Sequence, residues 1–298
     1  MTSPDSAELI AALRRTFGEH RGCRPVHAKG IVCTGTFTGH ADTARVCRAR
    51  HLEGEPVTVA ARLSNGTGHP DAPDWLRDRR GLATQFRLAD DTTTDLVAIS
   101  HPVYFAREPQ DLVDFSRMRL RDYLRAHPYA ATAIAIGQTS PPPASYATVA
   151  YHAVHAFRLL DAAGRGRWAR WHWRPAASAE PLPVADARER SPDYLRDDLA
   201  ARLASGPVRF ELEIELAADG DPVDDATALW EGERDRVAAG ILELERLAPE
   251  LDSGARLLVF DPTNVADGIE LSDDPVLRAR GGAYQLSARE RLRARESL

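Results

Sequence analysis

The stretch Pro207-Val-Arg-Phe-Glu-Leu-Glu-Ile-Glu-Leu-Ala217 decides the fold class of this chain. From Val208 to Leu216, apolar residues occupy every second position, and charged residues occupy the positions between them. Successive side chains of a β-strand point to opposite faces, so this period of two predicts a strand. One face of that strand must be buried and the other solvated.

More strand patterns precede this stretch. In residues 57–64 the apolar side chains share one face, whereas Arg62 and Ser64 share the other. The remaining predicted strands are 28–39, 81–88, 94–99, 147–159 and 167–174, with a hairpin at Gly164 and Gly166 between the last two. The sequence therefore predicts a run of short strands through the middle of the chain.

Helical patterns lie mainly toward the two ends. The predicted helices are 6–18, 109–126, 233–248 and 273–296, with Ser272 as the cap of the last one. Short strands without regular βαβ alternation indicate an antiparallel sheet or barrel with added helices. The Pro-rich stretch Thr139-Ser-Pro-Pro-Pro-Ala-Ser145 is too short to be a linker, so we expect one α+β domain over residues 1–298.

The composition is that of a soluble globular protein, with 43% hydrophobic and 28% charged residues. A net charge of −6 argues against a nucleic-acid partner. Apolar runs stay below the roughly 20 residues that span a membrane, and the first residues lack the features of a signal peptide. We therefore expect a cytoplasmic protein with no membrane partner. The odd number of cysteines, Cys23, Cys33 and Cys47, favours reduced thiols over disulfides.

Two residues of the last predicted helix suggest a metal ligand. Arg280 and Tyr284 are four positions apart, so they share one helix face. A guanidinium beside a phenol favours the phenolate. A phenolate is a hard anionic ligand that suits ferric iron. Such Arg–Tyr pairs are also common on ordinary helices, so the pair alone does not decide the function.

A histidine near the N-terminus suggests acid–base chemistry. His27 precedes a predicted strand and stands close to Gly30, so its ring can project into a pocket. Neutral imidazole can move a proton between two peroxide oxygens. An ordinary hydrogen-bonded histidine is the competing interpretation of this residue taken alone.

The order of several short motifs is more specific than any one of them. Along the chain follow His27-Ala-Lys-Gly30, Arg62-Leu-Ser64, Leu76-Arg-Asp-Arg-Arg-Gly-Leu-Ala83, Asp95-Leu-Val-Ala-Ile-Ser-His-Pro-Val-Tyr-Phe105, Tyr151-His-Ala-Val-His-Ala-Phe157, Phe260-Asp-Pro-Thr-Asn264, Asp267-Gly-Ile-Glu270 and Arg280-x-x-x-Tyr284. From residue 24 to residue 291 this series resembles the haem-dependent catalase family. It is most similar to the short catalase-related peroxidases, which keep the core and lack the long N-terminal arm and the C-terminal domain.

The resemblance implies a fold and a set of roles. The fold is an eight-stranded antiparallel β-barrel with surrounding helices, a catalase-like haem-binding core. His27 matches the catalytic histidine, Ser64 its hydrogen-bonding partner, and Tyr284 the ligand of the haem iron. The residues that match haem-contacting positions are Arg24, Val26, Arg62, His155, Arg280 and Arg291, of which Arg24, Arg62 and Arg291 match propionate-binding arginines. Without a Cys-x-x-Cys-His motif, haem b is the expected cofactor.

Two positions depart from the pattern of large catalases. Ile99 stands where those enzymes carry an Asn beside the iron, and Leu112 stands where many carry a Phe against the haem. Ser100 is a poor substitute for the Asn, because successive strand residues face opposite ways. Losing a preorganised polar group at a reacting centre often costs roughly 2–4 kcal/mol of barrier. We therefore expect weak hydrogen peroxide disproportionation.

Three functions are compatible with these residues. The first is a peroxidase that reduces hydrogen peroxide or organic hydroperoxides with a small organic donor. The second is a biosynthetic haem enzyme of the same fold, such as a hydroperoxide dehydratase or a metabolite-tailoring oxidase. The third is a haem carrier or sensor without turnover, against which the His27–Ser64 pair counts. A homodimer is the candidate assembly.

Overall fold

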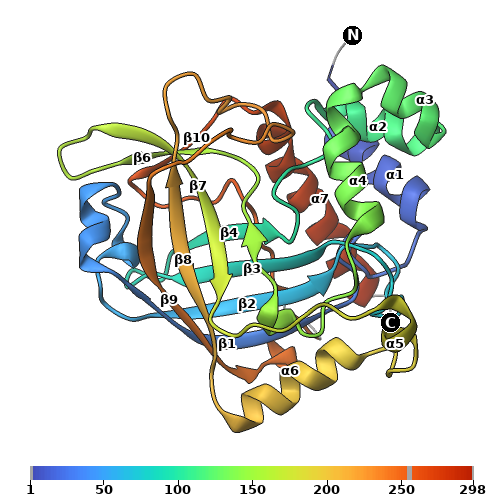
Figure 1. The fold of residues 1–298 in the computed structure, drawn as a ribbon, viewed down its shortest axis with the longest axis horizontal. Coiled ribbons are helices and arrows are strands. Elements are labelled where there is room, and N and C mark those ends of the chain that lie inside the picture. Colours follow the sequence, from blue (N-terminus) through green and yellow to red (C-terminus); the bar gives the residue numbers. More distant parts are fainter. Residues whose placement is uncertain (1–2, 254–256, 297–298) are drawn as a thin grey trace.

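The computed structural model describes residues 3–253 and 257–296, and its centre is a closed antiparallel β-barrel (Figure 1). Within the described residues eight strands form the ring, which closes where β7 pairs with β8. They are β1 (Gly30–Gly39), β2 (Val57–Asn65), β3 (Arg80–Arg87), β4 (Thr93–Ile99), β5 (Tyr151–His152), β7 (Gly166–Pro175), β8 (Val208–Leu216) and β9 (Arg236–Leu247). Two short strands, β6 (Phe157–Leu160) and β10 (Ile269–Leu271), extend the sheet beside β7. The predicted eight-stranded barrel is confirmed.

The inside of the barrel is the hydrophobic core. The predicted alternation in β8 is confirmed, because the apolar positions from Val208 to Leu216 are buried and the charged positions face out. Aromatic rings fill the centre, where Phe37 lies with its ring centroid 5.1 Å from that of Phe86 and 6.0 Å from that of Trp173. In β2 the predicted split also holds, since Ala61 and Leu63 face this core. Arg62 and Ser64 consequently point to the outer face.

Helices cover parts of the outer face. Those described are α1 (Ser6–Phe17), α2 (Pro109–Arg117), α3 (Leu120–Ala126), α4 (Ala131–Thr139), α5 (Val184–Arg188), α6 (Tyr194–Ser205) and α7 (Pro275–Glu296). Single 3-10 turns lie at η1 (Ala41–Arg45), η2 (Arg50–Leu52), η3 (Pro128–Ala130), η4 (Tyr146–Thr148) and η5 (Pro249–Asp252). In Figure 1, α1 to α4 and α7 gather on one side of the barrel, and α5 and α6 lie on another. Of these helices, none combines the length and the apolar character that crossing a membrane requires.

The predicted helix at 233–248 is wrong, because this segment is strand β9 between β1 and β8. Two bulges explain the misleading pattern. Register shifts at Ala239 and Glu245 place consecutive residues on the same face, so Ala239 and Gly240 are both buried. The apolar residues then recur at intervals of three and four, as they do in a helix. Pairing with two neighbouring strands overrides the helix propensity of its Ala, Leu and Glu residues.

Other predicted elements were only partly correct. The segment 147–159 contains two strands, β5 and β6, instead of one. The predicted helix 109–126 is broken after Arg117, where Met118 adopts an extended conformation. Helices α4, α5 and α6 were not predicted. Their side chains show weak amphipathic patterns, and α5 is a single turn and a half long.

Candidate functional site

A cavity lies between the outer face of the barrel and the helices α1, α2 and α7. Strands β2, β3 and β4 form one wall, and α7 forms the opposite wall. The cavity brings together eight of the nine predicted site residues, namely Arg24, Val26, His27, Arg62, Ser64, Arg280, Tyr284 and Arg291. The ninth, His155, lies behind Arg280 and contacts it.

On the barrel wall, the backbone of His27 is held in an unusual conformation. Its φ is +55°, a left-handed value that a non-glycine residue keeps only where its surroundings hold it. The His27 N–H donates to the carbonyl oxygen of Gly66 at 3.1 Å. Arg62 donates to the carbonyl oxygens of His27 and Ala28 at 2.8 and 2.9 Å. These bonds fix where the imidazole projects.

The imidazole itself is oriented by Ser64. Nδ1 of His27 lies 3.0 Å from the Ser64 hydroxyl oxygen. The other ring nitrogen, Nε2, has no partner among the described residues. Because the ring lines the cavity, Nε2 is the nitrogen that can exchange a proton with a molecule bound there.

Two glycines make room for this arrangement. Gly30 on β1 and Gly81 on β3 are the cross-strand partners of Ser64. A Cβ atom at Gly81 would lie 2.8 Å from two atoms of the His27 ring, and one at Gly30 would lie 2.5 Å from the Arg62 guanidinium. Real Cβ atoms essentially never lie this close to another atom, so a larger residue at either position would displace the His27 ring or the Arg62 guanidinium.

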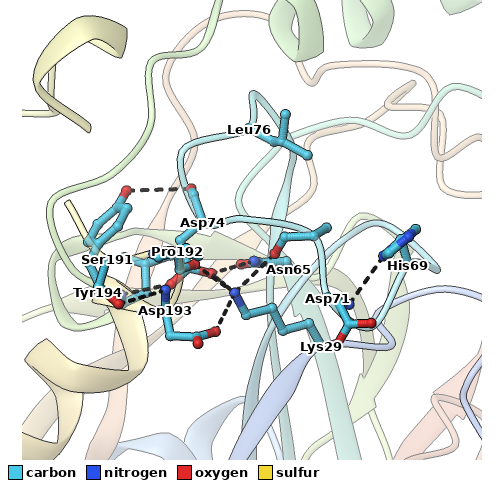
Figure 2. Close-up of polar contacts among 12 residues, drawn as sticks. Lys29, Asn65, His69, Asp71, Asp74, Leu76, Ser191, Pro192, Asp193 and Tyr194 are labelled. Atoms are coloured by element: carbon cyan, nitrogen blue, oxygen red, sulfur yellow. Dashed lines mark hydrogen bonds and ion pairs between the residues drawn. The ribbon is translucent and has the colours of Figure 1, made fainter. Parts of the chain in front are cut away.

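Lys29 anchors the segment two residues beyond His27 (Figure 2). Its Nζ donates to the carbonyl oxygens of Ala72 and Pro192 at 3.0 and 2.8 Å. The same atom pairs with the carboxylates of Asp74 and Asp193 at 2.9 and 2.7 Å. This four-oxygen cage ties the start of β1 to the loop after β2 and to the residues before α6.

The electrostatic setting keeps His27 neutral. Burial lowers the pKa of His27 well below its ordinary value, and the charges of Arg79, Arg62, Arg280 and Arg24 lower it further. Neutral imidazole is the form that acts as a base. Arg79 also lines the cavity and was missed by the sequence analysis, because a surface-type Arg in an Arg-rich loop carries no distinguishing signal.

On the helix wall, a chain of hydrogen bonds leads away from Tyr284. Arg280 donates from Nη2 to the Tyr284 hydroxyl at 2.6 Å, and its Nη1 lies 3.0 Å from Nε2 of His155. Nδ1 of His155 lies 2.7 Å from a carboxylate oxygen of Asp274. Because a guanidinium only donates, Nε2 of His155 accepts and Nδ1 carries the proton given to Asp274.

Asp274 has a second role that corrects one prediction. Its carboxylate accepts hydrogen bonds from the backbone N–H groups of Val276 and Leu277, so it caps α7. The predicted cap, Ser272, is wrong, because its buried hydroxyl makes no hydrogen bond within the described part of the chain, whereas Asp274 accepts from the first turn. One carboxylate therefore both begins α7 and orients His155.

The groups around Arg280 keep its guanidinium charged next to the Tyr284 phenol. Burial lowers the pKa of Arg280, but Tyr284, Tyr104 and Asp261 raise it more, so the pKa stays above its ordinary value. Burial also lowers the pKa of His155 despite its bond to Asp274. A neutral His155 is the form that can accept from Arg280.

At one end of the cavity arginines outnumber carboxylates. Arg24, Arg295 and Arg291 approach the Asp252 carboxylate at 2.8, 3.5 and 3.9 Å. The Arg291 side chain is 6% exposed, and its Nε and Nη1 atoms have no hydrogen-bond partner in the described part of the chain. Burial and the charge of Arg24 lower the pKa of both Arg62 and Arg291 to about 9. This surplus of positive charge fits a ligand with anionic groups.

The two departures noted in the sequence line the same cavity. Ile99 and Leu112 both face it, on β4 and α2. Ser100 does not replace a polar group here, because its hydroxyl accepts a hydrogen bond from the backbone N–H of Arg80 at 2.9 Å. On β4, between Gly81 of β3 and His152 of β5, the cavity wall is therefore apolar, because Ile99 occupies that position.

Comparisons with known proteins agree with this geometry. A family model described as catalase matches residues 7–297. A catalase-related peroxidase of Mycolicibacterium paratuberculosis is 39% identical over 97% of this chain and 95% of its own length. One of Synechococcus elongatus is 28% identical over 98% of this chain and 89% of its own length. A fungal catalase structure superposes with a TM-score of 0.82 at 23% identity, covering 92% of this chain and 60% of that one.

Proposed function

The chain belongs to the catalase family, and from that premise we propose that it is a haem peroxidase. It would reduce hydrogen peroxide or organic hydroperoxides with electrons from a small organic donor. The observation that carries this proposal is one cavity with a Tyr–Arg pair on one wall and a neutral His–Ser pair on the other. In this proposal Tyr284 would supply the iron ligand and His27 the base, from opposite walls of the same cavity.

The residues present fit a haem. Tyr284 would bind the iron. Buried Arg291, whose Nε and Nη1 atoms have no hydrogen-bond partner among the described residues, would bind the propionates together with Arg24 and Arg62. Val26 and the apolar lining would contact the macrocycle. When bound, the haem supplies an iron centre that exchanges electrons with peroxide and donor. Non-covalent haem b is part of the proposal, since the chain has no Cys-x-x-Cys-His motif.

His27 would handle the protons. Its Nε2 takes a proton from one peroxide oxygen and returns it to the other, so that the departing oxygen leaves as water. Ser64 holds the ring in place during this transfer, and Gly81 leaves the ring its space. Arg79 and burial keep the ring unprotonated before peroxide arrives.

Weak disproportionation of hydrogen peroxide is part of the same proposal. Ile99 offers no hydrogen bond to a second peroxide molecule, whereas the apolar wall at Ile99 and Leu112 favours an organic molecule. The single domain over 1–298, the homodimer and the cytoplasmic location remain predictions.

The test uses the purified protein reconstituted with haem. We expect peroxide-dependent oxidation of a chromogenic donor in the wild type. In His27→Ala we expect a loss of about 10²–10⁴-fold at unchanged haem content, the usual worth of a general acid–base group. His69→Ala is the matched control, because His69 is exposed and lies outside the cavity. Full activity in His27→Ala, or no oxidation in the wild type, would refute the proposal.

A further inference from the structure

A single row of residues crosses the outer face of the barrel and contains more than the His27 partners. Cross-strand pairs join Gly30 to Ser64, Ser64 to Gly81, Gly81 to Ile99, Ile99 to His152, and His152 to His172. Neighbouring strands are about 4.8 Å apart, so His152 lies roughly 10 Å along the wall from Gly81, where the His27 ring rests. His152 lines the same cavity.

His152 begins a hydrogen-bonded chain that leads out of the cavity. Its Nδ1 lies 2.8 Å from Nδ1 of His172, and Nε2 of His172 lies 3.0 Å from the Glu215 carboxylate. The side chains of His172 and Glu215 are 7% and 13% exposed. Glu215 continues to the half-exposed Arg236 at 2.8 Å. His152, His172 and Glu215 come from three different strands, β5, β7 and β8.

The acceptor at the end of this chain fixes the position of each proton. A carboxylate only accepts, so His172 must donate from Nε2 to Glu215. When both imidazoles are neutral, Nδ1 of His172 then accepts, and His152 donates to it from its own Nδ1. The remaining nitrogen of His152, Nε2, carries a bare lone pair and has no partner among the described residues. Burial, His172 and Arg174 lower the pKa of His152 to about 3, in agreement with a neutral ring.

The surrounding charges stabilise a proton taken up by the chain. Burial raises the pKa of Glu215, but the hydrogen bond and charge of His172, with Arg236 and Arg170, lower it more, so the carboxylate is ionised. On the neighbouring positions Arg174 and Arg236 both pair with Glu213. Arg170 donates to the carbonyl oxygens of Ala228 and Asp225. Because Arg174 and Arg170 have partners of their own, the charged group that contacts His172 directly is the Glu215 carboxylate.

We propose that His152 binds the hydroxyl group of a small phenol-type donor and that the His152–His172–Glu215 chain takes up the proton this donor loses. The proposal rests on the peroxidase function proposed above and names the class of its donor. The Ile99 side chain between His27 and His152, together with Leu112 and Val154, supplies an apolar surface for an aromatic ring. The lone pair of His152 is the acceptor that distinguishes a phenol from an apolar molecule of the same shape.

The proton and electron balance is simple. One hydrogen peroxide takes two electrons from two phenol molecules and two protons from solvent, which gives two water molecules and two phenoxyl radicals, while the two phenol protons are released to solvent. Each phenol O–H proton moves to Nε2 of His152, and the Nδ1 proton of His152 moves to Nδ1 of His172. The charge then rests as a His172 imidazolium against the Glu215 carboxylate. The proton leaves to solvent by way of the partly exposed Glu215 before the second phenol molecule reacts.

The first test measures binding without turnover. Calorimetric titration of the haem-loaded protein with p-cresol and with 4-methylanisole compares a phenol with its ether, which lacks the O–H. We expect the wild type to bind p-cresol roughly five- to tenfold tighter, the worth of one net hydrogen bond. His152→Phe should lose this preference. Equal binding of both probes by the wild type, or an unchanged preference in His152→Phe, would overturn the docking role.

The second test addresses the proton path with a matched pair of variants. Glu215 and Glu213 face outward on the same strand and both pair with Arg236, but Glu213 lies outside the chain. We expect Glu215→Gln to lower kcat for p-cresol oxidation about tenfold relative to Glu213→Gln, with a larger solvent deuterium isotope effect. Equal rates and isotope effects in the two variants would overturn the proton path. If the p-cresol preference persists while no donor is oxidised, the peroxidase proposal fails and the docking role stands.

Discussion

The two walls of the cavity hold their key residues by different means. On the barrel wall, His27 is placed by steric space, because Gly81 leaves room for the ring, Gly30 leaves room for the Arg62 guanidinium that holds its carbonyl, and the backbone is left-handed. On the helix wall, Tyr284 is placed by helix periodicity and by a charge chain through Arg280 and His155 to Asp274. The barrel wall should therefore be sensitive to volume, and the helix wall to charge.

The largest expected effect separates cofactor binding from chemistry. Tyr284→Phe removes the hydroxyl that would bind iron and leaves the volume almost unchanged. Loss of a group that merely supports a metal ligand costs about 10–100-fold in affinity, so loss of the ligand should exceed roughly 100-fold. Haem content and the Soret spectrum after reconstitution report the result. Normal haem retention with an unaltered spectrum would show that Tyr284 is not the ligand.

A gain of function should follow from restoring polarity to the barrel wall. Ile99→Asn places a hydrogen-bonding group between His27 and His152. We expect hydrogen peroxide disproportionation to rise by about 30-fold or more, since such a group is worth roughly 2–4 kcal/mol. Oxygen release measures it, and Ile99→Leu controls for repacking. An equal rise in both variants would assign the effect to shape alone.

Volume sensitivity of the barrel wall is tested by Gly81→Ala. The added Cβ would lie 2.8 Å from the His27 ring, so the ring must shift. We expect the peroxide reaction to slow by roughly tenfold to 100-fold, as a misplacement of about 1 Å does. Gly137→Ala on α4 is the control, because its Cβ would meet only His101 at 3.5 Å. Stopped-flow kinetics at unchanged haem content measures the rate of the peroxide reaction. Equal rates in Gly81→Ala and Gly137→Ala would show that the space beside the His27 ring is not needed.

Charge sensitivity of the helix wall is tested by Asp274→Asn. Asn still caps a helix, so α7 should remain intact while the charge that orients His155 is lost. We expect haem affinity to fall by about tenfold or less and the absorption spectrum to shift. Circular dichroism checks the helix. A spectrum identical to that of the wild type would show that the chain beyond Arg280 does not influence Tyr284.

The smallest effect concerns histidines that neither wall uses. Burial lowers the pKa of His51 and His101 to about 4. Below pH 6.5 the unfolded chain binds protons that the folded state does not, so stability falls as the pH falls toward 4. Each group contributes about 1.4 kcal/mol per pH unit in that window. Urea unfolding between pH 7 and pH 5 measures how the free energy of unfolding changes with pH. His51→Phe should reduce that pH dependence, and an unchanged pH dependence would contradict the prediction.

Much of the site could be predicted because its residues carry local patterns. Arg280 and Tyr284 share a helix face, and the motif around His27 has a fixed order relative to later motifs. Gly81 belongs to one of those motifs, but its role depends on the register between β2 and β3. His152 and Asp274 were missed as functional residues for a similar reason. Their partners are distant in sequence, and a single sequence does not state which strands become neighbours.

The fold was predicted where one face of a strand is continuous. Strand β8 alternates without interruption and was correctly predicted. Its neighbour β9 was not, because the bulges at Ala239 and Glu245 shift the alternation twice. A bulge is a property of a strand pair, so the sequence of one strand cannot reveal it.

The Lys29 cage has a practical consequence for labelling. Lys29 carries the only ε-amino group in the sequence, and every other cationic side chain of fixed charge is an arginine. With four oxygen partners and a side chain that is 14% exposed, this amine should acylate slowly in the folded protein. Its modification, followed by mass spectrometry at residue 29, would therefore record each opening of the loop that carries His27. The rate of Lys29 acylation thus serves as an intrinsic probe of how stably this part of the barrel wall is held.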